Sequence, residues 1–139
     1  MAVIGPGDAP VDAAAEVGRL VAERGAVVVC GGLGGAMESA CRGAKQAGGL
    51  TVGLLPGSDR AEANAFVDVA LPTGLGEARN ALVVGAADVV IAVGRGYGTL
   101  SEIALALRAG KRVIGLDSWD VEGVDAADGP EAAVSAALS

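Results

Sequence analysis

Residues 94–102, with the sequence GRGYGTLSE, combine three glycines with an arginine, a threonine and a glutamate between two apolar runs. Glycine lets backbone N–H groups approach an anion closely, and the start of a following helix adds positive potential. Arg95 stands between glycines, where its forked guanidinium either binds a phosphate or points into solvent. We therefore predict a phosphate site on four consecutive residues: Gly96, Tyr97, Gly98 and Thr99.

Two further glycine loops are expected at the same sheet edge. Gly5 and Gly7 follow the first apolar run, and Gly32, Gly34 and Gly35 follow the second. The second loop is not a dinucleotide fingerprint, because Met37 occupies the third glycine position and no P-loop lysine follows. Both loops either line the same ligand pocket or serve only as tight turns.

Two charged side chains are candidates for chemistry at this pocket. Thr99 and Glu102 have the spacing of a capping box, although Glu102 could instead direct its carboxylate into the pocket. Arg79 is expected near the start of a helix, where the helix dipole disfavours a cation. An anionic partner, either a phosphate or Glu102, would explain that position, and a solvated arginine is the alternative.

The elements that must hold these residues alternate between apolar runs and helical periodicity. Such strand–helix repeats predict an α/β fold: a three-layer Rossmann-like sandwich with a mostly parallel central sheet of about six strands, forming a single domain over residues 1–139. Ligands bind such sheets beyond the carboxyl ends of the strands, near the switch in strand order. The expected strands span residues 2–4, 26–30, 51–56, 67–71, 88–93 and 112–116, and the expected helices span residues 11–24, 36–47, 75–86, 99–108 and 130–138.

Composition narrows the function classes. The 139 residues carry a net charge of -7 and no basic cluster, which argues against nucleic-acid and membrane-surface binding. The absence of histidine excludes Ser-His-Asp and Cys-His catalysis and histidine-ligated metals, and we expect no metal site. Cys30 and Cys41 lack a CxxC spacing and are expected to be buried free thiols, whose role the sequence leaves open. With no signal peptide or membrane span, we expect a cytoplasmic protein.

Three segments carry a resemblance to a known superfamily. GGLGGAMESACRGAKQAGG, GLLPG and GLGEARNALVVGAADVVIAVGRGYGTLSEIALAL resemble the "lysine decarboxylase-like" or LOG (SLOG) Rossmannoid proteins. This superfamily includes the LONELY GUY-type phosphoribohydrolases, and the branch that looks nearest is that of the small bacterial molybdenum-cofactor carrier-like proteins. The hydrolase motif PGGxGTxxE is matched at Gly96, Gly98, Thr99 and Glu102. Gly94 and Arg95 depart from it, as does Asn80, which stands where the hydrolases have lysine.

The resemblance leaves three functions open. The first is binding of a phosphate-bearing, nucleotide-like ligand, such as the molybdenum cofactor, by a carrier or storage protein. The second is a nucleoside 5′-monophosphate phosphoribohydrolase of the cytokinin-activating type, in which Arg79 and Glu102 would be the catalytic pair. The third is a non-catalytic regulatory oligomer with a vestigial site. The sequence requires no cofactor, the ligand would be the molybdenum cofactor or a nucleoside monophosphate, and the superfamily implies a homo-oligomer, a dimer or tetramer.

Overall fold

The computed structural model describes residues 1–139 as alternating strands and helices. The strands are β1 (Ala2–Ile4), β2 (Val28–Cys30), β3 (Thr51–Leu55), β4 (Val69–Pro72), β5 (Val89–Val93), β6 (Arg112–Leu116) and β7 (Val124–Ala127). The helices are α1 (Asp12–Glu23), α2 (Ala36–Gln46), α3 (Arg79–Ala86), α4 (Tyr97–Arg108) and α5 (Pro130–Ala137), with 3₁₀ turns η1 (Arg60–Glu62) and η2 (Gly76–Ala78). No helix is long and apolar enough to cross a membrane.

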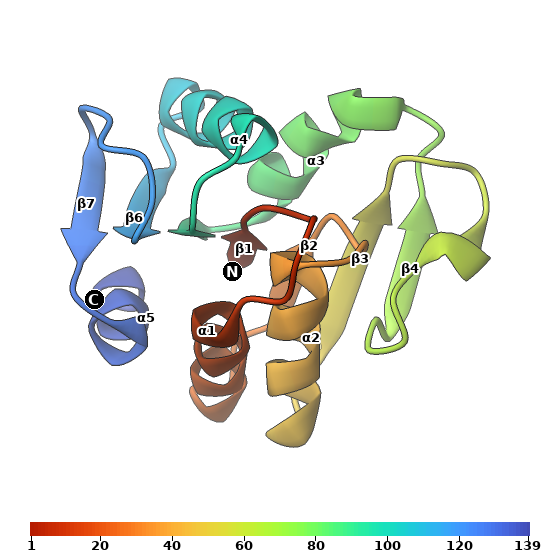
Figure 1. Cartoon of the computed structure of the whole chain (residues 1–139), viewed down its shortest axis with the longest axis horizontal. Coiled ribbons are helices and arrows are strands. Elements are labelled where there is room, and N and C mark those ends of the chain that lie inside the picture. The colour runs from red at the N-terminus through yellow and green to blue at the C-terminus, as the bar shows by residue number, and fades with distance from the viewer.

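All seven strands form one parallel sheet in the order β4-β3-β2-β1-β5-β6-β7 (Figure 1). The first strand pairs with β2 on one side and with β5 on the other, where Ala2 lies opposite Val90. The direction in which the chain adds strands therefore reverses at β1. This reversal leaves a crevice at the carboxyl ends of β1 and β5, because their following loops diverge to opposite faces.

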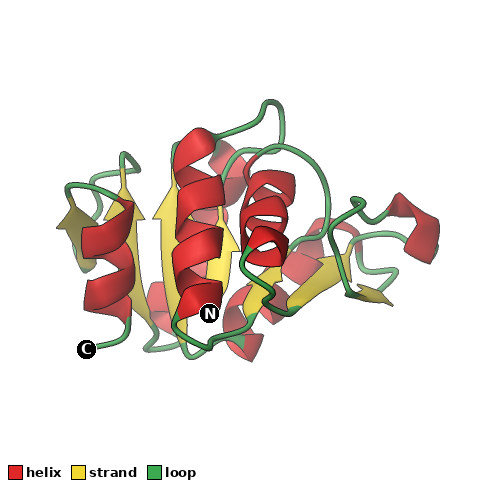
Figure 2. Cartoon of the chain, turned by 90° about the horizontal axis from the view of Figure 1, so that it is seen from below, coloured by secondary structure: helices red, strands yellow, loops and turns green.

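Helices cover both faces of the sheet, as the view from below the α1–α2–α5 layer shows (Figure 2). Alternate residues of β5 face opposite layers: Val89 and Ile91 belong to the core shared with α1, α2 and α5, whereas Val90 and Ala92 belong to the core shared with α3 and α4. A strand buried on both faces has no polar alternation, which is why the run VVIAV predicts a central strand. The α/β three-layer prediction is confirmed.

The seventh strand was not predicted from the sequence. Val124–Ala127 is an edge strand with the sequence VDAA, and Asp125 and Ala126 in its middle are exposed. It pairs only with β6 and lies at the edge of the sheet. A strand in this position needs neither a continuous apolar run nor alternating apolar residues, so its sequence shows no strand pattern. Edge strands of this kind are short and polar because they bury little surface.

Two buried thiols lie next to each other beneath the β2–α2 loop. Cys30 and Cys41 are both free and fully buried, as the sequence predicted. Their Sγ atoms are 3.5 Å apart, and the Gly32 N–H donates to the Cys30 Sγ at 3.3 Å. The pair therefore helps to hold the turn that leads from β2 into the glycine loop.

Helices α1 and α2 touch through glycine. A Cβ on Gly18 would lie 2.0 Å from the Ala40 carbonyl oxygen, and a Cβ on Gly43 would lie 1.9 Å from that of Ala15. Real Cβ atoms do not approach carbonyl oxygens so closely, so each helix offers a glycine to the backbone of the other. This contact sets how near the two helices lie, and with it the position of the loops at their ends.

We expect Gly18→Ala to lower the free energy of unfolding by at least about 2 kcal/mol, because the added methyl group must push two backbones apart. Gly85→Ala in α3 is the matched control, since a Cβ there meets no atom within 4 Å. That change should be neutral or stabilise by up to about 1 kcal/mol through helix propensity. Urea unfolding of both variants measures the difference, and equal stabilities would contradict the proposed helix contact.

Candidate functional site

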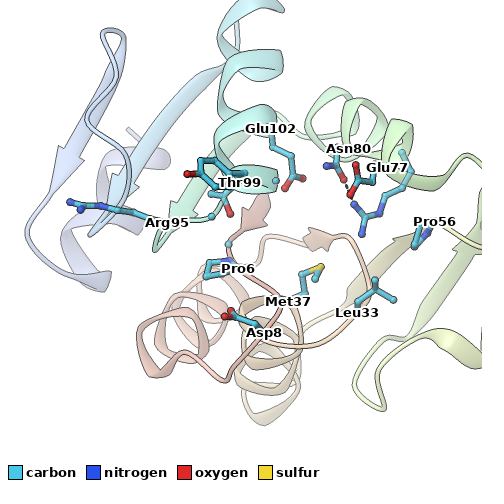
Figure 3. A pocket seen from close by; sticks show the side chains of 16 residues that line it. Pro6, Asp8, Leu33, Met37, Pro56, Glu77, Asn80, Arg95, Thr99 and Glu102 are labelled. Carbon is cyan, nitrogen blue, oxygen red and sulfur yellow. Dashed lines mark hydrogen bonds between the residues drawn. The ribbon is translucent and has the colours of Figure 1, made fainter.

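A cavity of about 530 Å³ opens at the carboxyl ends of β1 and β5, where the strand order reverses (Figure 3). The β1–α1 loop, the β2–α2 loop, the segment before α3 and the start of α4 contribute its walls. The lining residues are Gly5, Pro6, Gly7, Asp8, Leu33, Met37, Pro56, Glu77, Arg79, Asn80, Arg95, Gly96, Tyr97, Gly98, Thr99 and Glu102. The sequence-predicted loop of residues 95–99 and the predicted pair Arg79 and Glu102 thus meet in one place.

The start of α4 is open toward this cavity. The helix begins at Tyr97, no side chain caps it, and the first backbone bond of the turn runs from the Leu100 N–H to the Gly96 carbonyl at 2.9 Å. The capping box expected at Thr99 is therefore wrong, because the helix starts two residues earlier than the pattern indicated. Thr99 lies in the first turn, is only 2% exposed, and its hydroxyl has no hydrogen-bond partner.

The guanidinium of Arg79 is buried without a counter-ion. Its side chain donates to the Asn80 Oδ1 and, at 3.5 Å, to the Gly31 carbonyl, whereas its Nε atom has no partner. Arg79 is only 8% exposed and belongs to none of the ion pairs of the molecule. A Cβ on Gly31 would lie 2.6 Å from Arg79 Nη2, so glycine there leaves room for the guanidinium. A buried cation in this state is stabilised by an anion.

Glu102 reaches the cavity from the second turn of α4, across from Asn80 and Glu77 (Figure 3). Its carboxylate takes part in none of the ion pairs of the molecule, and the residue is only 8% exposed. Burial raises the pKa of Glu102 to about 7, and the positive charge of Arg79 opposes that rise. Near neutral pH the carboxyl group is therefore divided between its charged and neutral forms, and its neutral form can donate a hydrogen bond to an anion.

Only one of the β1–α1 and β2–α2 loops lines the cavity with its glycines. Gly5 and Gly7 line it, whereas Gly32, Gly34 and Gly35 lie outside the lining. At the start of α2 the first donor is already used, since the Ala36 N–H donates to the Pro6 carbonyl at 2.9 Å.

Asn64 fixes the same loop from the other side. Its amide donates to the Gly32 and Leu33 carbonyls at 3.3 and 2.9 Å. The loop of residues 31–35 is thus built into the fold by protein contacts, and it reaches the cavity through the side chains of Leu33 and Met37.

Arg95 lies at the rim. Its side chain is exposed, points away from Glu102 in Figure 3, and donates from Nε to the Ser118 carbonyl at 3.3 Å. Tyr97 also lies at the rim and is 85% exposed. Neither side chain is part of the buried floor that Arg79, Thr99 and Glu102 form.

Seven of the lining residues, Asn80 among them, were not predicted as site residues from the sequence. Asn80 is 8% exposed and accepts from Arg79, so it orients the guanidinium. Its position next to Arg79, where the hydrolase motif has lysine, was the available signal. Trp119 donates from its indole N–H to the Gly96 carbonyl at 2.9 Å, a contact between distant segments that no local pattern announces.

Chemically, the site can hold an anion and present it to a titratable carboxyl group. The unbonded N–H groups of the first helical turn, the Thr99 hydroxyl and the Arg79 guanidinium are all donors. They converge on one cavity. A dianion with tetrahedral oxygen geometry, such as a phosphate monoester, matches this donor set.

A family model described as the SLOG cluster4 family matches residues 1–137. The chain belongs to this family. An uncharacterized protein of Archaeoglobus fulgidus is 45% identical over 99% of this chain and 93% of its own. Among solved structures, the molybdenum cofactor binding protein of Rippkaea orientalis is 42% identical with a TM-score of 0.91, covering 97% of this chain and 92% of that one. The molybdenum cofactor carrier protein of Chlamydomonas reinhardtii is 36% identical with a TM-score of 0.87, covering 97% and 93%.

We expect Glu102→Gln to stabilise the protein more at pH 8 than at pH 5. Folding raises the pKa of Glu102 from 4.5 to about 7, so the folded state binds a proton that the unfolded state releases between these pH values. The stability that this proton contributes is complete at low pH and is lost as the pH rises from 4.5 through 7. The free energy of unfolding of the variant, relative to that of the wild type, should rise by about 2–3 kcal/mol between pH 5 and pH 8. Denaturant unfolding in buffers free of phosphate and sulfate measures it.

The exposed Glu122, which has no ion pair, provides the control substitution Glu122→Gln. It reports what the same substitution does to stability at an exposed position. A Glu102→Gln effect that stays constant between pH 5 and pH 8 would contradict a raised pKa at Glu102.

Proposed function

We propose that the protein binds the molybdenum cofactor through its phosphate and acts as a carrier rather than as an enzyme. The phosphate lies at the start of α4, between the free N–H groups of residues 97–99 and the Arg79 guanidinium. The cofactor is cargo in this proposal, so its chemistry is protected and not used.

The observation that carries the proposal is the set of buried donors without acceptors. Arg79 Nε and the Thr99 hydroxyl are buried and unpartnered in one cavity. A buried polar group without a partner costs about 1–3 kcal/mol, and more when it is charged. A bound phosphate removes both costs and adds charge-assisted bonds, which are stronger than neutral ones.

The comparisons support the choice of ligand. The two solved relatives that are 42% and 36% identical are described as binding or carrying the molybdenum cofactor, and each spans nearly the whole of this chain. The cavity of about 530 Å³ falls in the range of small-molecule sites.

We expect Thr99→Val to weaken binding of ribose 5-phosphate and of inorganic phosphate by roughly tenfold or more, because a hydrogen bond to a charged group is lost. The same change should leave the unliganded protein as stable as before or more stable, because it removes a buried hydroxyl that has no partner. Calorimetric titration and thermal unfolding measure the two effects. Thr99→Ser keeps the hydroxyl and should retain binding, so equal loss in both variants would contradict this role for Thr99.

Mass spectrometry of small molecules released from natively purified protein tests the identity of the cargo. We expect the molybdenum cofactor or its oxidised pterin degradation products, in amounts that fall in Arg79→Met. Recovery of ordinary nucleotides alone would contradict the carrier assignment while leaving the phosphate site intact.

Phosphoribohydrolase activity is the second candidate, and one observation favours it: Arg79 and Glu102 line the same cavity. A carboxylate in this position could stabilise the ribosyl centre or direct a water during cleavage of the N-glycosidic bond. Incubation with a panel of nucleoside 5′-monophosphates and chromatography for free base decides between the candidates. We expect no release; release that Glu102→Gln abolishes would establish the hydrolase and overturn the carrier proposal.

A further inference from the structure

Two of the three aromatic side chains of this protein stack on each other at the rim of the phosphate cavity. The chain has one Trp, one Tyr and one Phe. The rings of Tyr97 and Trp119 have centroids 6.0 Å apart and planes 27° apart. Trp119 is held by its hydrogen bond to the Gly96 carbonyl and by packing against the core under α3 and α4. Tyr97, in contrast, is 85% exposed, so a rigid aromatic surface faces solvent beside the site.

A second cavity, of about 330 Å³, lies on the far side of Trp119. It occupies the carboxyl ends of β6 and β7, where small residues of both strands form the floor. Trp119 lines this cavity and Tyr97 lines the first, so the stacked pair separates the two. Arg95 lines the first cavity and donates a hydrogen bond to the carbonyl of Ser118, which lines the second.

Two exposed carboxylates and one buried hydroxyl of the second cavity have no partner within the protein. Asp117 and Asp120 line it, and neither carboxylate takes part in a hydrogen bond or an ion pair within the protein. The Ser118 hydroxyl is buried there without a partner. Asp117 also adopts a left-handed backbone conformation with φ of 49°, which L-residues seldom take. Two exposed carboxylates that pair with no cation favour a ligand group that carries N–H donors over a second phosphate.

From these observations we infer that the second cavity and the Tyr97–Trp119 pair bind the ring system of the ligand, and that the ring carries a 2-amino-4-oxo-pyrimidine edge. Pterins and guanine share this edge, whose adjacent amino and ring N–H groups can donate together to one carboxylate. The ring would cover Tyr97 and present its donor edge to Asp117 or Asp120, while the phosphate occupies the start of α4. This inference rests on the proposed phosphate site.

Three probes that all carry a phosphate monoester distinguish the ring site from the phosphate site. Ribose 5-phosphate tests the phosphate site alone, AMP adds a ring without the donor edge, and GMP adds a ring with it. We expect GMP to bind about tenfold more tightly than AMP, as one good bidentate contact allows. AMP should in turn bind more tightly than ribose 5-phosphate, through stacking on Tyr97. Calorimetric titration at one pH and salt concentration gives the three affinities.

Variants test the placement of the ring. Tyr97→Ala should weaken binding of GMP and AMP by about tenfold, the usual scale of a base–aromatic contact, and should weaken binding of ribose 5-phosphate by less. The double variant Asp117→Asn, Asp120→Asn should remove the preference for GMP over AMP. Asp128→Asn is the matched control, because Asp128 is exposed and lies outside the second cavity, and it should change nothing.

The outcomes are distinguishable. Equal affinities for the three probes, or a preference for GMP that survives the Asp117/Asp120 double variant, would overturn the ring site and leave the phosphate site standing. Failure of ribose 5-phosphate to bind at millimolar concentration would overturn the proposed function and this inference with it.

Discussion

The functional part of the molecule depends on one uncompensated charge. The Arg79 guanidinium is buried beside Gly31 and Asn80, and no carboxylate pairs with it. Glu102 is the buried one of the three acids that line the same cavity, and burial raises its pKa to about 7. A protein that only needed stability would replace this arrangement with apolar packing, because an unpaired buried charge is costly. The fold therefore keeps an unpaired positive charge in this cavity, which is what an anion site requires.

The architecture decides which helix N-terminus lies beside that charge. Two helices, α2 and α4, begin at the same sheet edge after glycine-rich loops. At α2, the Pro6 carbonyl accepts from the Ala36 N–H, and Asn64 secures the preceding loop. No side chain caps either helix, but at α4 none of the N–H groups of residues 97–99 has a backbone partner. These α4 donors lie at the crevice made where β1 is flanked by β2 and β5.

Local pattern predicted the layers and most elements, since an apolar run such as VVIAV in β5 can only be a buried strand here. It also predicted that Arg79, Thr99 and Glu102 belong to one site. It misjudged the start of α4, because Thr99 and Glu102 satisfy capping-box spacing equally well when the helix begins at Tyr97. Contacts between segments distant in sequence, such as the Trp119 bond to Gly96 and the Pro6 bond to Ala36, leave no local trace and required the structure.

The central place of β1 has a consequence for biosynthesis. Its three residues are translated well before those of β5, Val89–Val93, which is one of its two neighbours in the sheet. Until β5 is made, a nascent chain can assemble β1 to β4 while the free edge of β1 keeps its backbone groups unpaired. The ligand crevice does not exist during that interval, because one of its walls has not been translated. Any ligand of this crevice can therefore bind only after β5 has paired with β1 and completed the middle of the sheet.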